Sequence, residues 1–156
     1  SSLDILLAGF HLTAYQEKLS DYFNLVWNGV SKYVARPSDG QIRRNTIAYI
    51  NAIRRNKIDI LTHIGFRLDI NYKEVSKCCA DYGTYVELSS RHKTPNDLSI
   101  QQVLEGGANF VVDSDAHKVE NVGQCGFALG LIEKYNISEK RIANCNGKKL
   151  TLRSKA

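Results

Sequence analysis

The residues of this sequence best suited to chemistry are its four histidines, because each stands just after a short apolar run. His11 follows ILLAGF, His63 follows IDILT, His92 follows YVELSSR, and His117 follows VVDSDA. Neutral imidazole binds divalent metals through a ring nitrogen, and histidines that converge from several rigid strand ends form a metal site. A single histidine in such a place is often structural, but the repetition at every histidine indicates a shared site.

The run Asp113-Ser-Asp115-Ala-His117 adds carboxylates to the same site. In an extended chain, side chains two residues apart point to the same side, so we expect Asp115 and His117 to act together. A carboxylate beside an imidazole suits a hard or borderline divalent cation. Asp113 is expected to support them from nearer the strand. The alternative interpretation is an acidic turn in which Ser114 and Asp115 cap the next helix.

These side chains need a scaffold that carries strand ends to one place, and the apolar pattern predicts one. Nearly continuous apolar runs are typical of strands in a parallel sheet that is covered on both faces. Helical patterns separate these runs, which predicts βα units whose strand ends converge on one face. The predicted strands are Leu3–Leu7, Ile58–Leu61, Tyr85–Leu88 and Asn109–Val112. The predicted helices are Gln41–Asn56, Tyr72–Tyr82, Asp97–Glu105 and Val122–Tyr135, with a short closing helix capped by Ser138.

The stretch Leu12–Gly40 does not follow this alternation. It mixes aromatic and polar residues and ends in a turn signal at residues 36–40, so it is predicted as an irregular, partly helical insertion. About four βα units are too few to close a barrel of seven or eight strands. Soluble proteins avoid an open edge of parallel strands. The sequence therefore predicts either missing N-terminal strands, the simpler answer, or an oligomer partner that covers the edge.

Composition limits the class of protein. The 156 residues are 43% hydrophobic, enough for the core of one domain, and the net charge is +5 from 21 Lys and Arg against 16 Asp and Glu. That excess suits an anionic substrate, but it is scattered along the chain, so nucleic acid is not indicated. The four cysteines form no C-x-x-C pair and are expected to be reduced and mostly buried, in a cytoplasmic protein. No signal peptide is recognised, and no apolar run reaches the roughly 20 residues of a membrane helix.

Four stretches, LDILLAGFH, IDILTHIG, TYVELSS and VVDSDAHKVENVG, resemble in order and spacing the later strands of phosphoesterases of the polymerase-and-histidinol-phosphatase (PHP) type. The resemblance runs from about Leu3 to Asn146, apart from Leu12–Gly40, and its most specific piece is SDAH followed by a Val-Gly pair. It implies an α/β fold that is part of a distorted (β/α)7 TIM-like barrel, with the N-terminal strands missing and residues 1–156 forming a single domain. It also implies a cluster of up to three divalent metal ions, zinc or manganese, with iron as a further option.

By motif, the resemblance implies a set of metal ligands, most of which also carry the catalysis. The implied ligands are His11, His63, Asp115 and His117, and the implied catalytic residues are His63, Asp115 and His117. Glu87 matches a position that is usually acidic and is expected to support the ligands without binding metal. Two features depart from the family pattern. Ile64 replaces the customary proline after His63, and the family's N-terminal H-x-H pair, a further histidine and a bridging glutamate have no counterpart here.

The expected function is hydrolysis of a small phosphorylated substrate by metal-activated water. Arg91 and His92 are expected to contact the anionic substrate from the rim, with solvated loop residues as the alternative interpretation. Because part of the family's ligand set is missing, the chain alone is expected to bind metal weakly and to have little or no activity. Two other functions stay open: a metal hydrolase of the amidohydrolase type, and a non-catalytic PHP module that has lost part of its metal site.

Overall fold

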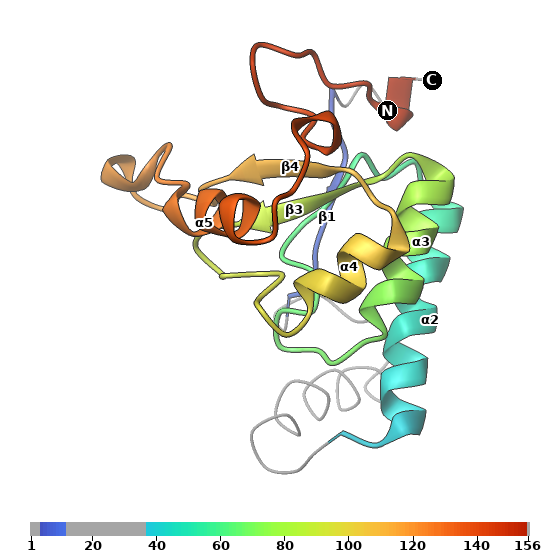
Figure 1. Ribbon diagram of the computed structural model, residues 1–156. Helices are drawn as coiled ribbons and strands as arrows, with labels where there is room; N and C mark the ends of the chain where they lie inside the picture. The colour runs from blue at the N-terminus through green and yellow to red at the C-terminus, as the bar shows by residue number, and fades with distance from the viewer. Residues whose placement is uncertain (1–3, 12–36, 156) are drawn as a thin grey trace.

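The centre of the molecule is a parallel sheet with helices packed against it (Figure 1). The computed structural model describes residues 4–11 and 37–155. The predicted insertion Leu12–Gly40 lies mostly outside the described residues. None of the described helices is both long and apolar enough to cross a lipid bilayer.

Strands and helices alternate along the described chain. The strands are β1 (Leu7–Ala8), β2 (Ile60–Leu61), β3 (Tyr85–Ser89) and β4 (Phe110–Asp113). The α-helices are α2 (Asp39–Arg55), α3 (Tyr72–Tyr82), α4 (Ile100–Gly106) and α5 (Gly126–Lys134), and short 3-10 helices lie at Val119–Asn121, Glu139–Arg141 and Arg153–Lys155. In this part of the chain the strands form one sheet in the order β1-β2-β3-β4, with every pair of neighbours parallel. The predicted α/β class and parallel sheet are confirmed.

The two faces of the sheet differ in character. Leu61, Val86 and Phe110 are paired across β2, β3 and β4, so their side chains share one face. All three belong to the main apolar core, which helices α2, α3 and α4 cover from one side of the sheet (Figure 1). Glu87 and Asp113 alternate with these residues along β3 and β4 and therefore project from the opposite face, which they share with the buried Val111.

A side-chain cap sets where α2 begins. Ser38 Oγ accepts a hydrogen bond from the backbone N–H of Gln41 (3.3 Å), and Asp39 in the first turn interacts favourably with the helix dipole. The turn predicted at residues 36–40 therefore ends earlier than expected. Ser38 is the N-cap, and Asp39 and Gly40 already belong to α2. The predicted cap at Ser138 is confirmed, since its side chain accepts the N–H of Lys140 (3.3 Å).

The other helices match the prediction unequally. Helix α3 has the predicted bounds and ends at Gly83, whose φ of 70° suits glycine. Helix α4 begins later than the predicted Asp97, because the Asn96 side chain accepts two backbone N–H groups (3.1 and 3.2 Å) and holds a turn there. Helix α5 begins later than the predicted Val122, because Gly123, with φ 78°, lies in a turn after the preceding 3-10 helix.

The first strand is shorter than predicted and begins later. It begins at Leu7, and residues 4–6 are not part of it; there the N–H of Leu6 donates to the buried carboxylate of Asp59 (2.7 Å). Leu3 lies outside the described residues. Asp59 Oδ1 also accepts the N–H of Ser154 (2.8 Å). This carboxylate therefore ties both ends of the described chain to the start of β2.

The cysteines are free, as expected, but only two of them are buried. Cys78 and Cys79 belong to α3 and lie in the apolar core, whereas Cys125 and Cys145 are partly exposed. Burial raises the pKa of the Cys79 thiol far above its ordinary value, with a smaller contribution from Cys78. The thiol of Cys79 is therefore inert, which agrees with the prediction that it is not a nucleophile.

Candidate functional site

The parallel sheet carries the carboxyl ends of its strands to one edge, and the predicted site residues follow those strand ends. His11 follows β1, His63 follows β2, His92 follows β3, and Asp115 and His117 follow β4. Because neighbouring strands in the sheet are also consecutive in the chain, these residues form a row along the edge.

Three histidine rings of this row are in contact. The ring centroids of His11 and His63 are 4.9 Å apart, and those of His63 and His92 are also 4.9 Å apart, both pairs meeting edge to face. Phe66 packs against the ring of His92 with a centroid distance of 4.1 Å. His63 is buried and His11 is exposed, so the row extends from the interior to the surface.

Asp115 joins these rings to the residues after β4. Its Oδ2 atom lies 2.9 Å from Nε2 of His92, and its Oδ1 atom lies 3.7 Å from Nδ1 of His117. His117 is largely exposed and contacts the guanidinium of Arg91. We call His11, His63, His92, Asp115 and His117 the histidine cluster.

Two residues of the histidine cluster have a backbone conformation that is costly for side chains other than glycine. His63 has φ 30° and Asp115 has φ 46°. Carboxyl groups on the face of the sheet opposite the main core hold both loops: Glu87 accepts the N–H of His63, and Asp113 Oδ1 accepts the N–H of Asp115 (2.8 Å). Glu87 and Asp113 therefore fix the positions of two cluster residues through the backbone.

Gly9 allows the segment after β1 to approach His63 closely. A Cβ atom at residue 9 would lie 2.6 Å from Cε1 and 2.8 Å from Nε2 of His63, and 2.2 Å from Oγ1 of Thr62. These distances leave no room for a side chain. Gly9 was not predicted as a site residue, although it belongs to the motif A-G-F-H and lies two residues before His11, which was the available signal.

Burial favours the neutral form of the inner histidines. It lowers the pKa of His63, and the neighbouring His92 and His11 lower this pKa further, against the attraction of Asp115. Burial also lowers the pKa of His92, against the same attraction. Neutral imidazole is the form that binds metal, so the inner histidines are in the state a metal site requires.

Glu87 is a neutral acid inside the protein. Burial, and then a hydrogen bond with Asp113, raise the pKa of Glu87 to about 9. A buried carboxylate close to a second carboxylate is costly, so the protonated form of Glu87 is favoured.

The donor types of the histidine cluster fit a divalent cation of borderline hardness, since they combine imidazoles with a carboxylate. Two buried polar atoms of the cluster have no hydrogen-bond partner: Nδ1 of His63, and Oδ2 of Asp115 despite its nearness to His92. Within the described residues, however, no group of three or more His, Cys, Asp or Glu side chains is arranged to hold an ion. The chemistry of the donors fits a metal, and their geometry is incomplete.

A hollow of about 200 Å³ opens beside Asp115 at the outer end of the histidine cluster. Hydrogen bonds fix part of its wall, since Ser90 Oγ accepts the N–H of Ala128 (3.1 Å) and Ser114 Oγ accepts the N–H of Gly123 (3.3 Å). Its lining residues are Ser90, Arg91, Ser114, Asp115, Ala116, Asn121 and Gln124. The guanidinium of Arg91 gives this hollow a positive charge next to the cluster.

Arg91 and His92, both predicted to lie at the rim, have different positions. Arg91 is exposed at the outer end, but the side chain of His92 is only 17% accessible and lies inside the histidine cluster. The chain turns back after β3, where the N–H of Ser89 donates to the carbonyl of Thr94 (2.9 Å), and this turn returns His92 to the strand end. His92 therefore lies further inside than the predicted rim position, because this turn returns it to the strand end, and its contact with substrate stays a prediction.

Comparison with known proteins finds relatives but no matching family profile. A protein of Shewanella sp. strain ANA-3 named "probable phosphatase" is 30% identical over 155 residues, which cover 92% of this chain and 52% of the relative. Probable phosphatases of Thermoanaerobacter sp. strain X514 (34% over 117 residues, 69% of this chain and 47% of the relative) and Aliivibrio fischeri strain MJ11 (30% over 110 residues, 63% and 44%) are also similar. The chain thus spans about half the length of the curated relatives it matches.

Proposed function

We propose that the protein hydrolyses phosphate esters as a PHP-type phosphoesterase, with the histidine cluster as its reaction site. The observation that carries the proposal is the continuous row of side-chain contacts from His11 to His117 along one sheet edge. Similarity to proteins named probable phosphatases supports the reaction class. Because the chain spans about half their length, the proposal extends to the activity of the complete enzyme.

The sheet supports a partial (β/α) barrel as the fold of this enzyme. In such a barrel, strands that are consecutive in the chain are neighbours in the sheet, and the helices lie outside it. The described sheet has this sequential order, with α2, α3 and α4 on one face (Figure 1). A doubly wound sheet reverses its strand order and carries helices on both faces. We propose that further strands beside β1 and β4 complete the barrel.

The proposed metal ligands are His11, His63, Asp115 and His117, and their chemistry suits zinc or manganese. A bound cation would supply a water of lowered pKa and would stabilise negative charge on the phosphoryl oxygens. Since the described donors are not arranged around an ion, the proposal requires additional ligands or a rotation of His11 and His117, the two exposed histidines of the row.

The other groups of the site would bind and orient the ester. Arg91 at the outer end would donate to the phosphoryl oxygens, because a guanidinium matches their geometry and charge. His92 would hold the carboxylate of Asp115 from the inner side, where the two atoms are 2.9 Å apart. Phe66 covers His92 and would keep water from that side of the cluster.

A non-catalytic PHP module is the second candidate, and one observation favours it. Within the described residues, the histidine cluster has the donors of a metal site without an arrangement that could hold an ion. A module that has lost part of its ligands would have this appearance. Metal content and turnover separate it from the phosphoesterase.

The test measures bound metal and hydrolysis on the same purified natural protein. We expect at least one divalent ion per chain, turnover of phosphomonoesters, loss of turnover on chelation and recovery with manganese or zinc. Asp115→Asn is expected to lower kcat/KM by about 100-fold. The matched control is Asp97→Asn, which removes an exposed acid paired with Lys134 outside the cluster and should leave kcat/KM unchanged.

Different results would refute different parts of this proposal. Turnover that survives both chelation and Asp115→Asn would remove the histidine cluster from the reaction. Absence of both metal and turnover would favour the non-catalytic module. Turnover of amides without turnover of phosphate esters would favour the amidohydrolase-type reaction.

A further inference from the structure

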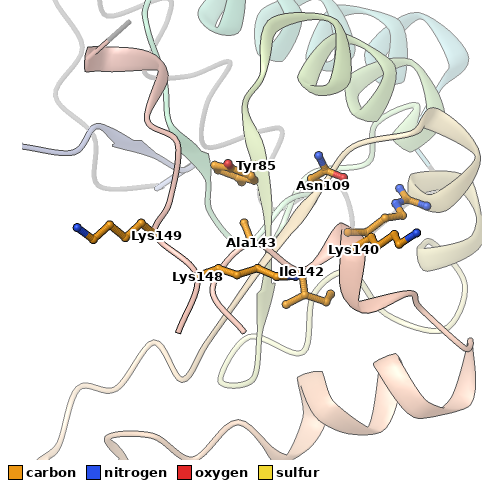
Figure 2. Close-up of a pocket in the computed structure, with 8 residues that line it drawn as sticks. Tyr85, Asn109, Lys140, Ile142, Ala143, Lys148 and Lys149 are labelled. Carbon is orange, nitrogen blue, oxygen red and sulfur yellow. The ribbon is translucent and has the colours of Figure 1, made fainter. Parts of the chain in front are cut away.

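A second hollow lies at the opposite edge of the sheet from the histidine cluster, where β3 and β4 begin. Its volume is about 360 Å³, and Tyr85 and Asn109 line it at the starts of these strands. Its remaining wall comes from residues 140–143 and 148–149, drawn in Figure 2. We call this hollow the basic pocket. No residue of the histidine cluster lines it.

The basic pocket is lined by four cationic side chains and by no acidic one: Lys140, Arg141, Lys148 and Lys149. Figure 2 shows Lys140 and Lys149 on opposite sides of the pocket, with Lys148 between them. Cationic side chains therefore lie on both sides of the hollow, with the ammonium groups of Lys140 and Lys149 directed away from one another in this conformation.

The hydrogen bonds of two of these cations leave their charge uncompensated. Arg141 donates to the backbone carbonyls of Leu104 (3.3 Å) and Ala108. Lys148 Nζ donates to the backbone carbonyl of Glu139 (3.0 Å). A carbonyl satisfies the donor but carries no net charge, so these bonds hold both side chains in place without an ion pair. The Arg141 guanidinium also lies 5.0 Å from the centroid of the Phe110 ring.

The other two cations, Lys140 and Lys149, are exposed and form no ion pair within residues 4–11 and 37–155. Glu139 precedes Lys140 in the chain, but its carboxylate does not line the pocket and accepts a hydrogen bond from Asn146 (3.1 Å). Several other lysines of the described surface are paired, as in Lys77 with Asp81 (3.1 Å) and Lys73 with Glu105 (3.0 Å). The basic pocket is therefore a local excess of positive charge.

The wall of the basic pocket is fixed to the sheet. Ile142 lies beside Phe110 as a parallel bridge, and the N–H of Ala143 donates to the carbonyl of Phe110 (2.8 Å). The Asn144 side chain bonds both the N–H and the carbonyl of Val112 (2.9 and 2.7 Å). These contacts hold the backbone that carries the cations in position before binding, so a ligand would have to order only the exposed lysine side chains.

We propose that the basic pocket binds a small phosphorylated organic compound. Its volume lies in the range of about 300–1,000 Å³ that is usual for small-molecule sites, so a bare phosphate would leave it partly empty. The lysines would bind the phosphate group, and Tyr85, Ile142 and Ala143 would pack against the organic part. This site is at the edge opposite the histidine cluster, so its existence does not depend on the proposed phosphoesterase activity.

The experiment follows backbone amide signals of the full chain by NMR, with chelator present so that no hydrolysis occurs. Ribose 5-phosphate is the probe, ribose is its uncharged match, and inorganic phosphate tests the bare anion. We expect ribose 5-phosphate to shift the amides of Asn109 and Ala143, ribose to leave them unchanged, and inorganic phosphate to bind there more weakly. Raising the salt concentration should weaken the binding.

Charge reversal locates the binding. The double variant Lys140→Glu, Lys149→Glu is expected to weaken binding of ribose 5-phosphate about tenfold. The matched control is Arg44→Glu, an exposed residue on α2 that changes net charge in the same direction and should leave the affinity unchanged.

Three results would overturn the proposal: no shift at Asn109 and Ala143, equal weakening by the Arg44→Glu control, or equal affinity for inorganic phosphate. Shifts at Gly9 and Ser114 report on the histidine cluster instead. Because the two sites are followed through different amides, absence of binding at the basic pocket does not decide whether the histidine cluster binds the probe.

Discussion

Substitution of Gly9 tests the close approach on which the histidine cluster depends. An alanine Cβ there would lie 2.2 Å from Thr62 Oγ1 and 2.6 Å from Cε1 of His63, on the order of 1 Å inside van der Waals contact. No positive φ favours glycine at this position, so the expected cost of Gly9→Ala comes from contacts alone. Thr62 would have to move, which strains its hydrogen bond to the carbonyl of Ala8 (3.2 Å).

The magnitude follows from two opposing effects. Overpacking a tight site costs about 1–3 kcal/mol, and alanine in place of glycine recovers about 0.4–1 kcal/mol by restricting the unfolded chain. The free energy of unfolding should therefore fall by about 1–2 kcal/mol. For a chain of this length, that corresponds to a fall in Tm of about 2–8 °C.

The assay combines thermal unfolding with NMR of the histidine ring protons. The matched control is Gly130→Ala in α5, where a Cβ meets no heavy atom within 4 Å. We expect that control to be neutral or stabilising by up to about 1 kcal/mol, as alanine is in an exposed helix. We also expect the His63 ring signals to shift in Gly9→Ala and to stay in place in Gly130→Ala. If Gly9→Ala kept both the Tm and the His63 signals of the original protein, the geometry argued for this edge would be incorrect.

Three further predictions concern stability. Asp59 is buried, and although burial raises its pKa, hydrogen bonds from backbone N–H groups outweigh this and lower it. Its stabilisation is present above the unfolded pKa of about 3.9 and is lost as pH falls through the lower folded value. The free energy of unfolding, measured in urea, should therefore fall less steeply at acid pH in Asp59→Asn than in the original protein. The pKa of Glu87 is raised to about 9, so the metal-free protein should lose stability as pH rises from the unfolded pKa of about 4.3 towards that value. Glu87→Gln, which retains an acceptor for the N–H of His63, should weaken that decline. If stability fell with pH equally in Glu87→Gln and in the original protein, both measured in chelator, this prediction would be contradicted. Ser76 is fully buried and donates to the carbonyl of Val103 (2.6 Å). Ser76→Ala should therefore lower the free energy of unfolding by about 1–3 kcal/mol. A negligible change in the urea midpoint would count against a stabilising role of this hydrogen bond.

Secondary structure was predictable where it depends on signals within a few residues. Helix α3 has its predicted bounds because an apolar stripe ends at Gly83, a residue that can adopt positive φ. The later starts of α4 and α5 were missed because they depend on turns at Asn96 and Gly123 that compete with helix formation. The start of β1 was missed because Asp59, distant in sequence, captures the N–H of Leu6.

The sequence by itself determined the parallel α/β sheet and the position of each histidine after a strand, because apolar runs and their periodicity are local properties of the chain. The tertiary structure alone decided which residues meet. The pairing of Glu87 with the His63 loop and the place of His92 beside Asp115 depend on strand register and on a turn. So does the basic pocket, in which Asn109 lies beside lysines from a later segment. Contacts between segments far apart in the chain follow from how all elements pack together, and no short stretch of sequence contains that information.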